Sequence, residues 1–285
     1  MKAGGDARLN TVLVISLLAA SLASLMVGPA GLTLSDVWHG LLTGDGAEGL
    51  ILRQIRLPRL LLALMVGFML GLSGAVLQGL LRNPLAEPAV FGAPQAAALG
   101  AAILLYAGLA DAVSWGLPLA AMLGALLSII LVWLVAGRSG SIVALLLAGL
   151  AVASLAGAGT ALTINLSPNP FAVMEVVFWL MPWMRFLSVS AVAMGVGAGV
   201  SVSGAISFVG LIAPHLVRSF VKGDPARLLL PSALAGALLL LLSDIAVRLI
   251  PSNSELKVGV LTVCLGVPFF LWLVATGRTR FGAQS

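Results

Sequence analysis

Long apolar segments with very few charges constrain this chain more than any other feature of its sequence. Eight are long enough to cross a bilayer, which takes about 20 apolar residues in a helix. They fall at about 10–30, 57–81, 89–109, 113–137, 141–166, 186–206, 229–250 and 256–276. A ninth apolar stretch, 207–217, is too short to span. No long polar linker separates them, so we predict one all-α integral membrane domain over 1–285, a polytopic helix bundle of about nine spans or partial spans.

Composition and charge agree with a membrane protein and argue against a nucleic-acid partner. Of the 285 residues, 60% are hydrophobic and 9% charged, whereas soluble domains carry about 25% charged residues. Fifteen Lys and Arg residues lie singly along the chain, which is typical of loop charges that orient spans. We interpret 10–27, after Lys2 and Arg8, as a retained first span, with a cleaved signal peptide as the alternative. The single Cys264 excludes an intrachain disulfide.

Two segments of the chain resemble each other. LSGAVLQGLLRNPL (72–85) aligns with VSGAISFVGLIAPHL (202–216), and in both a proline follows the serine by eleven residues. The aligned serine and glycine pairs are Ser73, Gly74, Ser203 and Gly204. Interrupted helices at matching positions of inverted repeats are typical of transporters. We therefore predict two inverted repeats, about 56–166 and 185–276, whose aligned small residues pack helices, and a short buried helix at 207–217.

The sequence contains no motif for catalysis, nucleotide hydrolysis or metal binding. The two histidines, His39 and His215, are far apart, and neither HExxH nor a phosphate-binding GxxxxGK[ST] loop occurs. Ser207, His215 and Asp244 could be combined into a hydrolase triad, but nothing in their spacing requires one. Asp244 lies four residues before Arg248, so one helix face can carry both as an ion pair. We expect this chain to be neither an enzyme nor the carrier of a cofactor or metal.

Five stretches, taken in order, resemble one family. They are RLPRLLLALMVGFMLGLSGAVLQGLLRNPLAEPAVFG (56–92), LLLAGLAVAS (145–154), GAISFVGLIAPHLVR (204–218), DPARLLLPSALAGALLLLLSDIAVR (224–248) and ELKVGVLTVCLGVPFFLWLV (255–274). Together they are similar to FecCD-type permease subunits of binding-protein-dependent ABC importers for iron-siderophore complexes, haem and cobalamin. The resemblance implies about ten spans per subunit, a homodimer in the bacterial inner membrane, two cytoplasmic ATPase subunits that carry ATP and Mg, and a periplasmic binding protein.

The resemblance also implies roles for individual residues. Arg56, Arg59 and Arg248 match arginines that meet carboxylates on the binding protein, where exposed Arg–carboxylate pairs supply register and orientation. The alternative is that they are span-end charges only. A second set matches cytoplasmic motifs near the ATPase contact: Arg82, Asn83, Pro84, Pro214, His215 and Arg218. That match favours a structural or coupling role for His215 over metal binding.

One part of the family pattern is missing. The family follows FWLM with a further span and then a cytoplasmic coupling loop that inserts into the ATPase. Here FWLM (178–181) runs directly into PWMRFLSV, which resembles the start of the seventh span. We interpret this as a deletion near 181–183 that removes the sixth span and the coupling loop.

The deletion raises the question of how the C-terminal half is oriented. Only 168–184 remain to cross back, and eleven to fourteen helical residues reach roughly 17–21 Å, short of the ~30 Å hydrocarbon core. Charge opposes inversion, because the family arrangement places ten of the fifteen basic residues in the cytoplasm. We hypothesise that 171–184 crosses as a strained, partly extended segment and that the C-terminal half keeps the family orientation.

These observations predict a permease that moves an iron chelate, haem or cobalamin from periplasm to cytoplasm by alternating access. Its expected partners are a second copy of itself, the ATPase subunits, the binding protein and membrane lipid. A degenerate permease without active transport is the alternative. An ion-coupled secondary transporter, which would use Asp244 and Glu175, is a further one.

Overall fold

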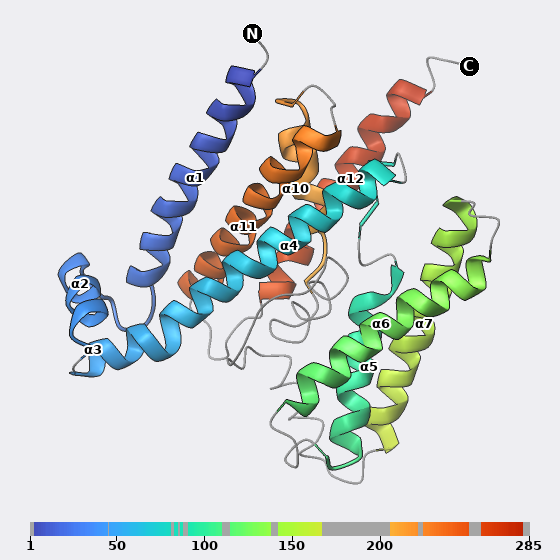
Figure 1. Cartoon of the computed structure of the whole chain (residues 1–285), viewed down its shortest axis with the longest axis horizontal. Helices are drawn as coiled ribbons and strands as arrows, with labels where there is room; N and C mark the ends of the chain where they lie inside the picture. The colour runs from blue at the N-terminus through green and yellow to red at the C-terminus, as the bar shows by residue number, and fades with distance from the viewer. Residues whose placement is uncertain are drawn as a thin grey trace.

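The computed structural model describes residues 3–44, 46–80, 83–84, 86–87, 91–109, 115–137, 142–166, 206–221, 225–250 and 258–281. Within these ranges all regular structure is helical (Figure 1). The elements are α1 (Ala3–Met26), α2 (Leu34–Leu42), α3 (Gly46–Leu50), the π-helix η1 (Ile51–Arg56), α4 (Leu57–Leu80), α5 (Ala93–Tyr106), α6 (Gly116–Ala136), α7 (Ile142–Leu166), α10 (Val209–Arg218), α11 (Pro225–Leu249) and α12 (Val258–Phe281). The predicted all-α membrane fold class is confirmed.

Five helical segments of the described residues are long and apolar enough to cross a membrane. They are Asp6–Met26, Gly46–Gly79, Gly116–Ala136, Ala144–Leu166 and Ala226–Leu249. The predicted short element at 207–217 is α10, whose residues are mostly buried. The predicted span at 186–206 lies, except for its last residue, outside the described residues. The number of spans and the inverted repeats therefore stay predictions.

The stretch 89–109 differs from its predicted length. The helix in it, α5, has 14 residues, which reach about 21 Å and fall short of the ~30 Å core. Gly92 precedes it at φ 74° and Gly108 follows it at φ 67°. Both are left-handed conformations that interrupt a helix and suit glycine. The apolar run is therefore longer than the helix it forms.

Close backbone contact holds α4 against α11. A methyl group on Gly67 would lie 2.5 Å from the carbonyl oxygen of Gly236, and one on Gly71 would overlap that of Ser232. Small residues four apart let two helix backbones approach this closely. Gly71, later in α4, contacts Ser232, which is earlier in α11 than Gly236, the partner of Gly67. The two helices are therefore antiparallel.

The two ends of α11 show how it is oriented relative to α1. Near its start, Arg227 pairs with Asp6 at 3.1 Å, and near its end Arg248 donates to the carbonyl of Ser24 at 2.8 Å. The two helices are therefore parallel, and the chain termini lie at the same end of the molecule (Figure 1). The orientation of the C-terminal half in the membrane stays a prediction.

A second group is formed by α5, α6 and α7. Methyl groups on Gly100 and Gly124 would overlap the carbonyls of Ala120 and Ala96, so α5 and α6 also pack backbone to backbone. One core cluster connects this group with the first. It consists of Val66, Leu70, Ala93, Ala97, Ala101, Ala121, Ala125, Ile206, Val209 and Leu240. Half of this cluster is alanine, and small side chains at such contacts are typical of helices that associate in lipid.

Large apolar side chains cover much of the outer surface. On α6, Leu123, Leu127, Trp133 and Leu134 are each more than half exposed. In water such a surface would be an aggregation liability. In a membrane it is the surface that faces acyl chains or a second protein, which fits the span-length helices.

Candidate functional site

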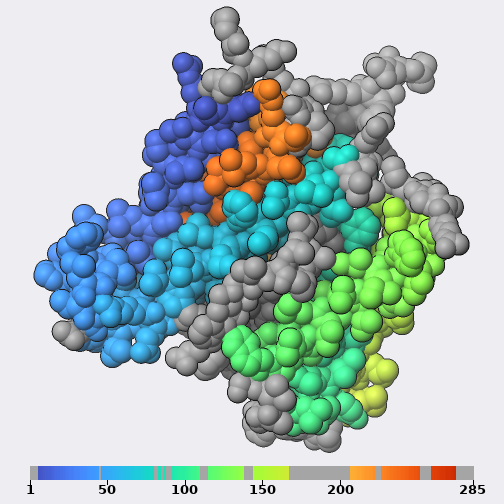
Figure 2. All heavy atoms as spheres, viewed as in Figure 1, coloured from blue at the N-terminus to red at the C-terminus, as the bar shows by residue number. Residues whose placement is uncertain are grey.

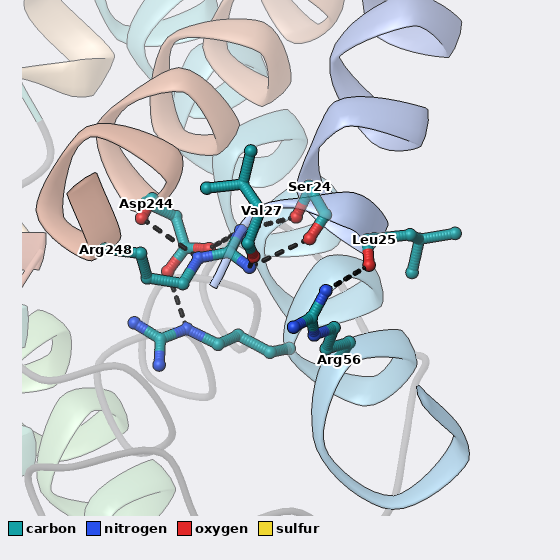
Figure 3. Close-up of polar contacts among 7 residues, drawn as sticks. Ser24, Leu25, Val27, Arg56, Asp244 and Arg248 are labelled. Atoms are coloured by element: carbon teal, nitrogen blue, oxygen red, sulfur yellow. Dashed lines mark hydrogen bonds and ion pairs between the residues drawn. The ribbon is translucent and has the colours of Figure 1, made fainter. Parts of the chain in front are cut away.

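Basic side chains gather where α1 and α11 end and α4 begins (Figure 3). Arg59, in the first turn of α4, donates from Nε to Asp244 Oδ1 at 2.8 Å. Arg248 Nη2 lies 2.8 Å from Asp244 Oδ2, close enough for an ion pair but not aligned as a hydrogen bond. Asp244 is only 3% exposed. Its charge is therefore neutralised inside the protein by two arginines, which a buried carboxylate requires.

Arg56 and Arg248 also bind carbonyl groups at the end of α1. Arg248 Nη1 donates to the carbonyls of Ser24 at 2.8 Å and Val27 at 3.0 Å, and Nη2 donates to Ser24 Oγ at 2.6 Å. Arg56 Nη1 donates to the carbonyl of Leu25 at 2.5 Å. The last carbonyls of a helix have no partner within it, and positive charge stabilises that end. Both arginines therefore cap α1.

The structure thus brings together the three arginines predicted to dock a binding protein, but it gives them partners within the chain. Arg56 is 5% exposed, and the side chains of Arg248 and Arg59 are 10% and 23% exposed. The predicted pair of Asp244 with Arg248 is present. A docking role stays a prediction, and of the three arginines Arg59 alone keeps a substantial part of its side chain open.

At the other end of α4, a buried amide compensates for a proline. Pro214 lies inside α10 and has no N–H to donate to the carbonyl of Gly210, four residues earlier. Gln78, 2% exposed, places Nε2 at 3.5 Å from the carbonyl of Gly210 and 3.4 Å from that of Leu211. Its Oε1 accepts a hydrogen bond from Arg218 Nη2 at 2.7 Å. Gln78 therefore connects α4 both to the freed carbonyl and to the last residue of α10.

Glu87 binds the beginning of α10. The backbone N–H of Phe208 donates to Glu87 Oε1, so a carboxylate lies at the helix N-terminus, where negative charge is stabilised. Phe208 has φ 70°, which is uncommon for a residue other than glycine. Burial raises the pKa of Glu87 to about 7, while the hydrogen bond from Phe208 acts in the opposite direction. Glu87 and Gln78 thus hold α10 from its two ends.

The predicted helix-packing residues of the first repeat lie between α4 and α10. A methyl group on Gly74 would overlap the carbonyl oxygen of Gly210. Ser73 is 1% exposed and donates to the carbonyl of Leu70 at 3.1 Å. Their counterparts Ser203 and Gly204 lie outside the described residues.

The other residues predicted on the ATPase side lie near the same end. His215 meets the ring of Phe269 in α12 edge-on, with centroids 5.4 Å apart, and its Nδ1 is buried without a hydrogen-bond partner. Asn83 follows α4, and its N–H donates to the carbonyl of Gln78 at 3.2 Å. Pro84 is exposed in the turn that follows. Arg82 lies outside the described residues.

In the part of the chain that the structure describes, no three His, Cys, Asp or Glu side chains lie together in a way that could hold a metal ion. Asp244 is paired with Arg59 and Arg248, and Glu87 accepts a hydrogen bond from the N–H of Phe208. Neither carboxylate belongs to a set of metal ligands.

Comparison with known proteins decides the family. The sequence model of the FecCD transport family matches residues 16–184 and 182–276. The chain belongs to the FecCD transport family. It is 32% identical to the hemin transport system permease protein HmuU of Yersinia pestis, with 94% of this chain and 95% of that protein aligned. It is 34% identical to the vitamin B12 import system permease protein BtuC of Salmonella paratyphi A, with 90% and 94% aligned.

A solved structure has the same fold. It is described as an inward-facing conformation of a metal-chelate type ABC transporter, and it matches with a TM-score of 0.79 and 27% sequence identity. The match covers 94% of this chain and 99% of that chain. The predicted resemblance to FecCD-type permeases is therefore confirmed.

The matches contain a break at an informative position. The family model matches in two segments that meet at 182–184. The alignment with HmuU has 321 positions, although 94% of a 285-residue chain is about 268 residues. About 53 positions of that alignment therefore lack a residue of this chain. Both observations are what a deletion near 181–183 would produce, and the deletion itself stays a prediction.

Sequence reasoning missed three residues that the structure places in these clusters: Ser24, Gln78 and Glu87. Gln78 and Glu87 lie at the two ends of the stretch QGLLRNPLAE, which contains the predicted ATPase-side residues Arg82, Asn83 and Pro84. Their closeness to these residues in the sequence could have identified them. Ser24 gave no signal, because serine is common in membrane helices.

Proposed function

We propose that this chain is the membrane-spanning subunit of an ATP-driven importer that moves haem, an iron-siderophore complex or cobalamin into the cytoplasm by alternating access. The permease assignment follows from the family. The substrate class is inferred from the hemin and vitamin B12 permeases, which align over nearly their whole lengths. That near-complete alignment is the observation that carries the proposal.

We propose a homodimer of this chain with two cytoplasmic ATPase subunits and a periplasmic binding protein, in the bacterial inner membrane. The chain has no phosphate-binding loop, so ATP and Mg would be bound by the ATPase subunits. An exposed apolar surface on α6 and other helices supports contact with lipid or with a second copy.

On the periplasmic side, Arg59 is the arginine best placed to meet a carboxylate of the binding protein. Arg56 and Arg248 are occupied by carbonyls of α1, and moving either would leave those groups unpaired. Arg59 has Nε on Asp244, but its side chain is 23% exposed. It can therefore contact a partner while keeping its internal ion pair.

On the cytoplasmic side, the end of α10 and the turn after α4 are the proposed ATPase contact. If the coupling loop is deleted as predicted, a movement of the ATPase would have to reach the bundle through these elements. Gln78 and Glu87 connect α10 to the end of α4 and the turn after it by hydrogen bonds. A displacement of α10 or of this turn by the ATPase would therefore also move α4.

A degenerate permease without active transport is the second candidate. It is favoured by the break at 182–184, because a permease without a coupling loop receives little of the ATPase stroke. An ion-coupled transporter has less support, since Asp244 is paired with two arginines of the same chain. Glu175 lies outside the described residues.

Uptake into proteoliposomes tests the proposal. The complete complex would be reconstituted with ATP inside, and labelled haem, a ferric siderophore and cobalamin would each be offered with their binding proteins. We expect accumulation of one of the three with ATP and none with a non-hydrolysable analogue. A correctly assembled complex that accumulates none of them would favour the degenerate permease.

A further inference from the structure

The short helix α2 presents three distinct faces. Val37 is 3% exposed and packs with Leu52 in a core cluster, and Gly40 lies against Gly49. A second face is polar and carries Ser35, Asp36 and His39. The third face is apolar and open: Leu34, Trp38 and Leu42, spaced four residues apart, are 57%, 65% and 64% exposed. Residues four apart share one side of a helix, so these three form a stripe.

A capping box stabilises the start of α2, and hydrogen bonds from η1 at its other end fix which way the stripe faces. At the start, Thr33 Oγ1 accepts from the N–H of Asp36, whose carboxylate accepts from the N–H of Thr33 at 2.7 Å, which is a capping box. At the end, Arg53 of η1 donates to the carbonyls of Gly40 at 3.2 Å and Leu41 at 2.7 Å. The stripe is therefore held on the side of α2 away from the protein.

The length of the neighbouring helix sets the depth of α2. Gly46–Gly79 is continuous over 34 residues, which is about 50 Å of helix, whereas the hydrocarbon core is ~30 Å thick. Even a tilt of about 40°, the upper end of the usual range, leaves it about 10 Å too long. Residues 59–79 alone suffice to span. Arg53 and Arg56 mark the end that emerges, so α3 and η1 lie at headgroup depth, and α2 packs against both.

We propose that α2 is an interfacial anchor, with the Leu34–Trp38–Leu42 stripe lying against the phospholipid of the outer leaflet. Tryptophan favours the boundary between headgroups and acyl chains, and a helix with one apolar and one polar face lies along that boundary. Leu50 and Ile55, 55% and 57% exposed, extend the apolar surface onto α3 and η1. Figure 2 shows this part of the chain at the lower left edge of the molecule, uncovered on the face in view.

The anchor has a structural consequence. Arg53, which holds α2, and Arg56, which caps α1, both belong to η1. Contact between α2 and lipid therefore fixes the depth of the arginine cluster at the start of α4. This inference rests on the membrane fold and the family, and it stands whether or not the chain transports.

Spin-label accessibility tests the proposal. In a Cys264→Ser background, single cysteines at positions 34, 35, 38, 39 and 42 of the full chain would be labelled in phospholipid vesicles. Collision rates with oxygen, which partitions into lipid, and with a nickel chelate, which stays in water, would be compared.

We expect the ratio of oxygen to nickel collisions at positions 34, 38 and 42 to be several-fold higher than at 35 and 39. Equal access of nickel to all five positions would overturn the proposal. So would low access of both reagents at the stripe, which would mean that a protein covers it.

A second measurement does not depend on labelled cysteines. Fluorescence of the wild-type protein and of Trp38→Phe would be compared in vesicles of phospholipid brominated near the headgroup. The fluorescence that the substitution removes is expected to be strongly quenched by bromine. An unquenched difference spectrum would contradict the anchor.

Discussion

Replacing Arg248 by alanine separates a capping role from a docking role for the arginine cluster. The substitution removes the donors to the carbonyls of Ser24 and Val27 and one of the two cations that neutralise Asp244. Each buried acceptor left unpaired costs about 1–3 kcal/mol, and breaking a buried ion pair costs about 3–5 kcal/mol. Arg59 still pairs with Asp244, which offsets part of the loss. We expect a net destabilisation of about 3 kcal/mol or more.

Arg227→Ala is the matched control on the same helix. Arg227 pairs with Asp6 at the opposite end of α11, where the two side chains are 45% and 25% exposed. An exposed pair of this kind contributes about 0–1 kcal/mol. Thermal unfolding in detergent should therefore show a large loss for Arg248→Ala and little change for Arg227→Ala.

Binding-protein affinity, measured on the folded fraction, completes the comparison. We expect Arg59→Ala to weaken docking and also to lower stability, because it removes the hydrogen bond to the buried Asp244. We expect folded Arg248→Ala to dock nearly as the wild type does. An Arg248→Ala protein as stable as the wild type but unable to dock would refute the capping assignment.

Three further predictions follow from the packing around α10. Gly74→Ala should destabilise the protein, because the added methyl group would overlap the backbone carbonyl of Gly210. Gly157→Ala on α7, where nothing lies within 4 Å, is the control and should be neutral or stabilising by up to about 1 kcal/mol. Equal melting temperatures of the two variants would contradict this prediction. Since the pKa of Glu87 is raised to about 7, stability should be greatest below about pH 4.5 and fall as pH rises to about 7, by on the order of 3 kcal/mol. Glu87→Gln should remove this dependence, and an unchanged pH profile of unfolding would contradict it. Gln78→Leu should lower binding-protein-stimulated ATPase activity more than Gln78→Glu, which keeps the acceptor for Arg218; equal activities would exclude this role.

The sequence was sufficient for the fold class because apolar segment length and the scarcity of charge decide it. It also predicted the short helix α10, since Pro214 and the basic residues after it end an apolar run. It overestimated α5, because apolar composition does not show where left-handed glycines such as Gly92 interrupt a helix.

The functional residues were harder to predict for a physical reason. The three arginines predicted to dock a binding protein lie together at one end of the bundle. A sequence does not show whether an arginine meets a partner protein or a carbonyl of its own chain. Arg56 and Arg248 bind carbonyls of their own chain because α1 ends beside them. These contacts join segments that are far apart in the sequence. Gln78 was overlooked because its partner is a carbonyl freed by a proline more than a hundred residues away.

Co-purification of this chain with its cognate ATPase subunit, followed by ATPase measurements with and without binding protein, tests the central claim most directly. The account predicts a stable complex whose ATPase activity the binding protein stimulates, which would mean that α10 and the turn after α4 suffice for coupling. A chain that inserts and folds but forms no complex with the ATPase would contradict the claim of active transport.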